Sequence, residues 1–279
     1  MNLYISLCFS MSRPNHKPER QRVTLLDSVV MQGLSRHTAL TAEDKTLLLS
    51  LELNPRRVSA GEVLWQESAD VDLFCVIKEG WAYSYRNLGN GSMQILKVYL
   101  PGDIIGIRDF GFSRRLAGVA MINDGLISPF THQQLFELFG RSPALAAGLL
   151  ATVVRQQALL TERLVYLGRY AAHERLAHFL YELYLRLKRI GAVEENGFHM
   201  PLSQEQVGDA LGLSAVHVSR TFSMLRDEGL VIRDRQHVVL PDPDALARLV
   251  EFNDTYIDEA LPVAFQSFAG MRSTTAPQA

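Results

Sequence analysis

The chain of 279 residues is 47% hydrophobic and 21% charged, which is ordinary for a soluble globular protein and long enough for about two domains. Its 28 Lys and Arg against 30 Asp and Glu give a net charge of −2, so no global basic excess indicates a nucleic-acid partner, although a local basic face is enough to bind DNA. The two cysteines, Cys8 and Cys75, exclude a disulfide framework and a four-cysteine metal site built by one chain, and they fit a reducing cytoplasm.

Residues 1–24 are predicted to be a disordered tail, because their basic residues follow the mildly apolar start, the reverse of a secretory signal. A helical pattern then runs from Leu25 to Leu53. Thr41, followed by two acidic residues, is expected to cap a helix within it. No segment approaches the roughly 20 apolar residues that cross a bilayer. The longest candidate, Pro143–Val154, ends at an arginine, so no membrane partner is predicted.

Residues 25–142 are predicted to contain an antiparallel β-barrel or jelly roll. Short apolar runs are separated by turn signals, a pattern typical of antiparallel all-β folds. The runs are Val58, Val63–Trp65, Leu73–Ile77, Ala82–Tyr85 and Gln94–Leu100. Cys75 lies in one of them and is expected to be an inert buried thiol.

Residues 143–168 are predicted to form a long helix with an apolar seam. A heptad read from Ala146 has one polar position, Gln157, and such a residue fixes the register of a parallel two-helix dimer. The predicted dimer seam comprises Leu150, Val153, Gln157, Leu160, Leu164 and Leu167. An amphipathic helix packed on its own domain is the alternative.

Residues 169–242 contain a stretch, Leu202–Leu230, that predicts a helix, a tight turn and a second helix. Ser203 and Gln206 form a capping-box pattern, Gly212 stands at the turn, and Ser214 caps the second helix. Apolar residues supply the shared core: Val207, Leu211, Leu213, Val218, Phe222 and Leu225. Gly208 is expected to let the two helices cross closely. Two strands, Leu230–Ile232 and Val238–Leu240, are predicted to follow as a wing.

The outer face of the second helix carries small residues and one arginine, a shape that fits the DNA major groove. Arg220 is expected to donate two hydrogen bonds to guanine, and Ser203 and Gln204 to hold a phosphate at a helix N-terminus. The predicted DNA-binding residues are Ser203, Gln204, Ser214, Ala215, Val216, His217, Ser219, Arg220 and Ser223, with Arg233 and Arg235 in the wing.

A barrel, a long helix and a winged helix-turn-helix in this order resemble the Crp/Fnr superfamily of bacterial transcription regulators over about residues 25–242. The resemblance implies an α+β protein with a sensor barrel and a dimerisation helix, acting as a cytoplasmic homodimer on a palindromic operator and contacting RNA polymerase. In that family a Glu usually precedes the central hydrophobic residue of the recognition helix by two positions and an Arg follows it by two. Here Val218 is that residue and Arg220 matches, but Val216 replaces the Glu, which puts the usual operator in doubt.

Residues 243–279 are predicted as a C-terminal extension and tail, with a helix from Asp242 to about Glu259.

The effector of the sensor domain is less clear from the residues. Cyclic-nucleotide binders of the family resemble one another in a Gly-Glu followed by Arg, a hydroxyl residue and Ala. Here Gly106 precedes Ile107, and Arg115 precedes Leu116, so two of three ligand groups are absent and a cyclic nucleotide is not expected. Gly106, Arg114 and Arg115 are the candidate effector-binding residues for another anion; surface charges beside a hairpin are the alternative.

Other cofactors and catalysis are not predicted either. The cysteine group of an iron–sulfur cluster is missing, and the spacing of His173 and His178 is poor for a metal on a helix. Because no catalytic constellation stands out, an enzyme is not expected. The sequence therefore favours a DNA-binding regulator that answers to an unidentified signal. The alternatives are a ligand-independent DNA-binding dimer and a protein-interaction module that does not bind DNA.

Overall fold

The computed structural model describes residues 28, 30 and 40–258. The predicted tail, residues 1–24, lies outside this part of the chain, as does most of the helical pattern from Leu25 to Leu40. Helix α2 (Ala42–Ser50) begins at the expected cap. The Thr41 hydroxyl accepts a hydrogen bond from the Asp44 amide (3.1 Å), and the Asp44 carboxylate accepts one from the Thr41 amide (2.8 Å), so two otherwise unpaired donors of this helix end are satisfied.

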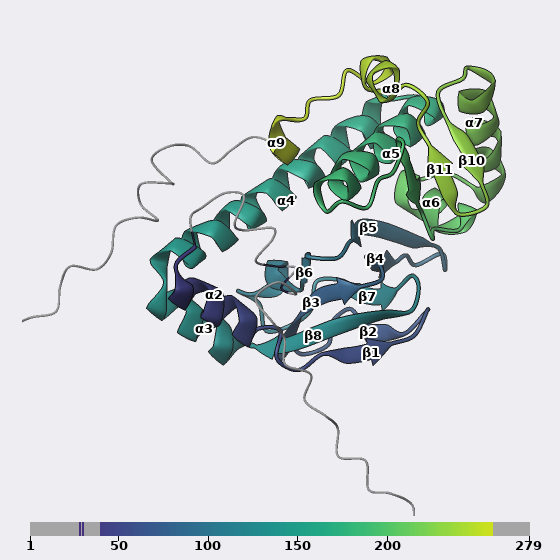
Figure 1. The fold of residues 1–279 in the computed structure, drawn as a ribbon. Coiled ribbons are helices and arrows are strands. Elements are labelled where there is room, and N and C mark those ends of the chain that lie inside the picture. Colours follow the sequence, from purple (N-terminus) through teal and green to yellow (C-terminus); the bar gives the residue numbers. More distant parts are fainter. Residues whose placement is uncertain (1–27, 29, 31–39, 259–279) are drawn as a thin grey trace, which may run out of the picture.

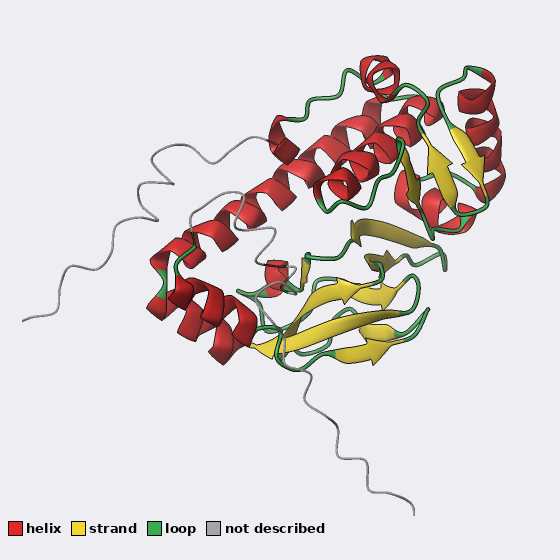
Figure 2. Ribbon diagram, in the orientation of Figure 1, coloured by secondary structure: helices red, strands yellow, loops and turns green. Residues whose placement is uncertain are grey.

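Two four-stranded antiparallel sheets form an N-terminal β-roll. One has the strand order β1-β8-β3-β6 and the other β2-β7-β4-β5; both are drawn in yellow in the lower part of Figure 2. The strands are β1 (Arg56–Val58), β2 (Val63–Trp65), β3 (Leu73–Glu79), β4 (Ala82–Asn87), β5 (Met93–Tyr99), β6 (Ile104–Ile105), β7 (Gly118–Met121) and β8 (Gly125–Thr131). The predicted antiparallel barrel or jelly roll is confirmed.

Strands β7 and β8 were not predicted from the sequence. Both begin with glycine, and β8 contains Pro129, residue types that are uncommon in strands. Long-range pairing decides their conformation instead, because β8 lies between β1 and β3 and β7 lies between β2 and β4. Cys75 of β3 is buried, and burial raises the pKa of its thiol to about 12, in agreement with the expected inert thiol.

Two helices lead out of the β-roll. Helix α3 (His132–Arg141), which was not predicted, begins with a capping box formed by Thr131 and Gln134. Helix α4 (Pro143–Arg169) follows after the single residue Ser142, whose hydroxyl accepts the Leu145 amide (3.1 Å) and donates to Asp44 (2.5 Å). Figure 1 shows α4 running diagonally from α3 to the C-terminal domain.

The C-terminal domain combines three helices with a three-stranded sheet of order β10-β11-β9. Its elements are α5 (Ala172–Arg189), β9 (Gly197–His199), α6 (Gln204–Leu211), α7 (Ala215–Asp227), β10 (Ile232–Asp234) and β11 (His237–Val239). The wing strands lie one or two residues away from the predicted positions. Leu230 and Val231 do not pair with a strand, because their amides donate to Leu225 O and close the end of α7 (2.9 and 3.3 Å).

A buried charge network joins the β-roll to α4 and α5. Arg186 of α5 donates to Val98 O of β5 (2.8 Å) and to the Asp103 carboxylate (2.9 Å). Glu182, which is 1% exposed, accepts from Arg186 (3.2 Å) and from Arg163 of α4 (3.1 Å). Burial alone would raise the pKa of Glu182, but the two arginines outweigh it and hold this pKa below its usual value. The network therefore keeps ionised groups of three elements in contact.

The C-terminal extension differs from the single helix predicted between Asp242 and about Glu259. Helix α8 (Pro243–Leu249) begins at the expected Asp242 cap but ends early, and Glu251 has a positive φ of 47°, a conformation that a helix does not continue through. The Asn253 side chain then accepts a backbone N–H and opens a short helix, α9 (Thr255–Asp258).

Candidate nucleic-acid interface

The α6–turn–α7 unit has the local geometry that its sequence predicts. Ser203 and Gln206 form the capping box at the start of α6, and the Ser214 hydroxyl accepts the His217 amide (3.2 Å) at the start of α7. Gly212 ends α6 with a φ of 67°, which a residue with a side chain rarely adopts. The role expected for Gly208, a close crossing of the two helices, needs a correction. A Cβ there would lie 2.4 Å from Leu213 O, so its missing side chain makes room for the turn rather than for a helix crossing.

Helix α7 has one buried face and one open face. Val218 and Leu225 are fully buried, and Phe222 is 8% exposed. Outward-facing Val216 is 62% exposed. The other predicted contact residues of α7 are exposed (His217 and Arg220) or half-buried (Ala215, Ser219 and Ser223). The open face thus combines one arginine with small side chains, and no described residue lies over it to block a groove-sized partner.

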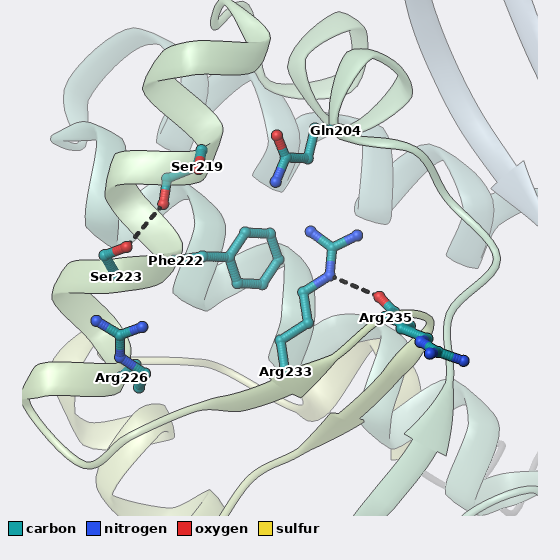
Figure 3. A pocket seen from close by; sticks show the side chains of 7 residues that line it. All are labelled: Gln204, Ser219, Phe222, Ser223, Arg226, Arg233 and Arg235. Carbon is teal, nitrogen blue, oxygen red and sulfur yellow. Dashed lines mark hydrogen bonds between the residues drawn. The ribbon is translucent and has the colours of Figure 1, made fainter.

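A pocket of about 310 Å³ lies between α7 and the wing (Figure 3). It is lined by Gln204, Ser219, Phe222, Ser223, Arg226, Arg233 and Arg235. Three of these side chains are cationic, and no carboxylate lines the pocket. Sequence analysis missed Arg226 and placed Phe222 only in the core. The available signal was the spacing of Arg226, three residues after Ser223 and seven after Ser219, which places the three on one face of the helix.

Arg233 lies at the floor of this pocket and braces the wing. Its guanidinium stacks over the Phe222 ring at 4.5 Å, its Nε donates to Arg235 O (3.1 Å) and its Nη2 donates to Leu202 O (3.3 Å). Nη1 is buried without a hydrogen-bond partner, and desolvation lowers the pKa of the group. A lone buried donor of a cation is a place where an anion is stabilised. Because Nη1 is itself buried, Arg233 does not present this nitrogen to DNA in the present conformation, whereas Arg235 is exposed.

Helix α4 carries exposed apolar residues along most of its length. Leu150 is 58% exposed and Leu164 74% exposed, and Gln157 lies exposed between them. The remaining seam residues, Val153, Leu160 and Leu167, are half-buried; Val153 and Leu167 pack against core clusters of this chain. Each interpretation of the seam thus fits part of it. Val153 and Leu167 pack on the domains of their own chain, whereas the exposed residues have no described partner.

By length and composition α4 would also cross a bilayer, which corrects the expectation that no segment approaches this limit. An 18-residue window has a mean hydropathy of 1.3, and 22% of that window is buried. Both ends of the helix are nevertheless built into the fold. Leu145 and Leu149 belong to the core that includes β3, and Tyr166 belongs to the C-terminal core.

The candidate effector residues of the β-roll meet in one place, where Arg115 is buried and Arg114 is a surface charge. Arg115 is 2% exposed; its guanidinium stacks over the Trp65 ring at 4.0 Å and donates to Leu73 O. Its nitrogens also lie 3.7 Å from the Asp109 carboxylate and 3.5 Å from Asp72. The surface interpretation of Arg115 is therefore wrong, because aromatic and acidic side chains from distant parts of the chain enclose it.

Gly106 and Arg114 complete this group. Gly106 opens the single turn η2 (Ile107–Asp109) with a φ of 88°, and a Cβ there would lie 2.9 Å from Nη1 of Arg115. Arg114 is exposed and pairs with Asp70 at 3.0 Å. A neighbouring cavity of about 680 Å³ is lined by Glu67, Ser68, Arg86, Leu96, Arg108, Phe112, Ser113, Arg114, Arg115 and Leu116.

Comparison with known proteins agrees with this architecture. Residues 55–142 match the family model described as a cyclic nucleotide-binding domain, and residues 174–249 match the Crp-like helix-turn-helix domain. The chain belongs to the Crp/Fnr superfamily of bacterial transcription regulators. Proteins of this family are transcription regulators rather than enzymes, and this chain is a DNA-binding transcription regulator.

Individual relatives of this Crp/Fnr regulator span most of its length. The transcriptional activator protein FnrL of Cereibacter sphaeroides is 28% identical over 235 residues, covering 82% of this chain and 93% of FnrL. The nitrogen fixation regulation protein FixK of Bradyrhizobium diazoefficiens is 29% identical, covering 72% of this chain and 84% of FixK. The solved structure of FixK2 from Bradyrhizobium japonicum is similar with a TM-score of 0.64 and 25% identity, covering 70% of this chain and 96% of FixK2.

Proposed function

We propose that this regulator binds a palindromic operator as a cytoplasmic homodimer, with α7 of each copy in the major groove. The observation that carries the proposal is the open face of α7 beside a pocket that three arginines line. Base edges are read by side chains on such a face, whereas cationic pockets at its border hold the phosphate backbone. In the same proposal the regulator contacts RNA polymerase, as the activator names of its relatives suggest.

Each side chain of the interface has a definite role in this proposal. Arg220 donates two hydrogen bonds to guanine O6 and N7, Ser219 reaches a base edge, and Val216 contacts a thymine methyl group. Ser203 and Gln204 offer the N-terminus of α6 to a phosphate. The pocket with Arg226 and Arg233 takes a phosphate on the wing side.

The homodimer rests on the exposed part of the α4 seam. A parallel pairing would bury Leu150 and Leu164 and place the two Gln157 side chains opposite each other. Leu164→Glu is expected to give a monomer in light scattering, because a carboxylate cannot enter an apolar seam. Thr161→Glu is the matched control, since Thr161 is exposed on α4 outside the seam and its substitution leaves a dimer. A dimeric Leu164→Glu protein would contradict the seam.

We further propose that a cyclic nucleotide is not the effector and that the chain holds no iron–sulfur cluster. Arg115, the arginine of the cassette, is engaged by Asp109, Asp72 and Leu73 O, and no hydroxyl or glutamate stands at the other ligand positions. Isothermal calorimetry with cyclic AMP is expected to give no binding heat at concentrations up to about 1 mM, where binding energies fall to about 4 kcal/mol. A signal at the β-roll is then another ligand, or the barrel serves the DNA-binding dimer without one.

The test of the whole proposal is the selection of binding sites from random duplex DNA by the purified protein at fixed salt. Two half-sites related by a dyad and separated by about 10 base pairs, one helical turn, are the expected result. Leu164→Glu serves as the control that loses the palindrome but retains α7. If the wild-type protein enriches no sequence, α7 does not read DNA here and the protein-interaction alternative gains support.

A further inference from the structure

The C-terminal segment lies across the joint between α4 and α5. Helix α4 ends at Arg169 and α5 begins at Ala172, so the joint consists of Tyr170 and Ala171, both in extended conformation. Helix α8 packs against α5, and α9 returns to pack against α4. Figure 1 shows α9 beside α4, well away from α8. The segment between them therefore spans the point at which the long helix meets the DNA-binding domain.

Contacts with the joint and with α5 hold this segment in place. The Tyr170 hydroxyl, from the joint itself, donates to Val250 O (3.2 Å), and Arg189 donates to Ile257 O. Val250 and Ile257 are each 2% exposed. The Phe252 ring lies 4.6 Å from the His178 ring and 4.8 Å from the Tyr181 ring, both on α5. Burial of these side chains opposes any movement that separates the segment from either helix.

Residues 250–258 lie beyond the stretch that matches the Crp-like helix-turn-helix model, which ends at residue 249. Their contacts with α4 and α5 are thus an addition to the matched domain rather than part of it. A tail with no structural role would expose such residues. Here, instead, Val250 enters the main core cluster of the C-terminal domain.

We propose that residues 250–258 form a strap that fixes the angle between α4 and the DNA-binding domain. The strap joins α5 to α4 around Tyr170, so rotation at the joint would break the Tyr170–Val250 bond and uncover Phe252. A joint held in one conformation lowers the ordering cost of engaging two half-sites at a set spacing. This consequence for DNA rests on the proposed function; the restraint of the joint does not.

The experiment compares hydrogen exchange and operator binding in the full-length protein and its variants. Phe252→Ala and a chain ending at Glu251 are expected to raise amide exchange in residues 169–175 at least tenfold, while the amides of α6 and α7 keep their protection. Operator affinity is expected to fall three- to tenfold. The matched control is Phe136→Ala, which should change neither quantity. Phe136 is 58% exposed and belongs to α3, a helix that Figure 1 shows well away from α9.

Unchanged exchange in residues 169–175 of folded Phe252→Ala protein would overturn the strap. An increase that spreads over α5, α6 and α7 would overturn it too, because Phe252 would then be an ordinary core residue. If the truncated chain does not fold, the Phe252→Ala comparison decides. Faster exchange with unaltered operator affinity would refute the consequence for DNA. Wild-type protein that binds no operator would refute the proposed function, and the exchange data would still decide the strap.

Discussion

The β-roll and the DNA-binding domain each contain an arginine-lined hollow, and the two hollows differ in what surrounds the charge. Arg115 in the β-roll is enclosed by Trp65, a carbonyl and two carboxylates of its own chain. Arg233 in the wing also stacks on an aromatic ring, but its hydrogen bonds go to backbone carbonyls alone. Both arginines keep buried nitrogens without a hydrogen-bond partner, Nε and Nη1 in Arg115 and Nη1 in Arg233, so the difference lies in the neighbouring carboxylates. Within the described residues, no carboxylate approaches Arg233.

The presence or absence of carboxylates beside each arginine indicates where an external anion is stabilised. Burying a charge is costly unless it is paired, and an arginine that its own chain has already paired has little to gain from a ligand. An arginine with no carboxylate beside it gains a charge-assisted hydrogen bond when a phosphate reaches its guanidinium. An arginine in a hollow is therefore not by itself a sign of a ligand; its internal partners decide.

The largest expected effect comes from breaking the enclosed pair. Arg115→Ala should lower the free energy of unfolding by about 3–5 kcal/mol, because it removes one of the two arginines beside buried Asp109, leaving Arg108 at 3.8 Å, and exposes the Trp65 ring. Urea titration measures this change. Arg114→Ala, at the exposed neighbour, is the matched control and should stay within about 0.5 kcal/mol. Equal, small effects of both substitutions would show that Arg115 is as solvated as Arg114.

The buried imidazole of His178 should make the free energy of unfolding depend on pH, with a somewhat smaller effect than that of Arg115→Ala. Burial is the main cause that lowers the pKa of His178 to about 4 from 6.5; Glu182 opposes the shift and Arg163 adds to it. Between these values the unfolded chain binds a proton that the folded chain refuses. Stability is therefore full above pH 6.5 and falls as the pH drops toward 4, by about 3 kcal/mol at most.

Urea titrations of the wild type and His178→Leu across this pH range isolate the contribution, because the carboxylates titrate in both proteins. The difference in unfolding free energy should change with pH below 6.5 and be constant above it. A constant difference throughout would mean that His178 takes up its proton in the folded state as easily as in water.

At the open surface, the expected effects are on binding rather than on stability. Arg220→Ala should weaken operator binding by about 1–3 kcal/mol and relax the preference at one base pair of each half-site, because a bidentate contact to guanine is lost. Competition binding against single-base operator variants measures both changes. If the affinity falls equally for all sequences, Arg220 contacts phosphate rather than a base.

The smallest expected effect belongs to the border of the same surface. Arg226 is exposed and pairs with its exposed neighbour Asp227 at 2.9 Å. Arg226→Ala should weaken binding by less than tenfold for every sequence and reduce the slope of log affinity against log salt by about 1, the loss of one phosphate contact. Arg248→Ala is the control, an exposed arginine on α8 outside the pocket. An unchanged slope would place Arg226 outside the interface.

The helix-turn-helix was predicted from sequence almost residue by residue because its signals are local. The capping pairs at Ser203 and Ser214 and the turn at Gly212 act within a few residues, so the same bonds form wherever the segment lies. Strands β7 and β8 had no such local signal. Their glycines and proline disfavour strands, and partners from distant parts of the chain overrule that preference.

The site predictions divide along the same line. Spacing along one helix identified the open face of α7, because helical geometry alone places residues on faces. It did not identify the Arg233–Phe222 stack or the enclosure of Arg115, since each brings together residues from separate elements. The early end of α8 was likewise not predicted. Asp242 is a cap that indicates where a helix begins, but no residue near Glu251 indicated that the helix would end there.

The sequence by itself determined the order of the domains, the caps and turns of the helix-turn-helix and the residues on the open face of α7, because these depend on chemistry within a few residues of one another. Only the tertiary structure decided which arginines are neutralised internally, how the β-roll is joined to α5 through Glu182 and Arg186, and that the C-terminal segment crosses the α4–α5 joint. Those outcomes depend on which distant side chains meet in the folded chain. The cost of desolvating each charge then depends on whether such a meeting supplies it with an oppositely charged partner.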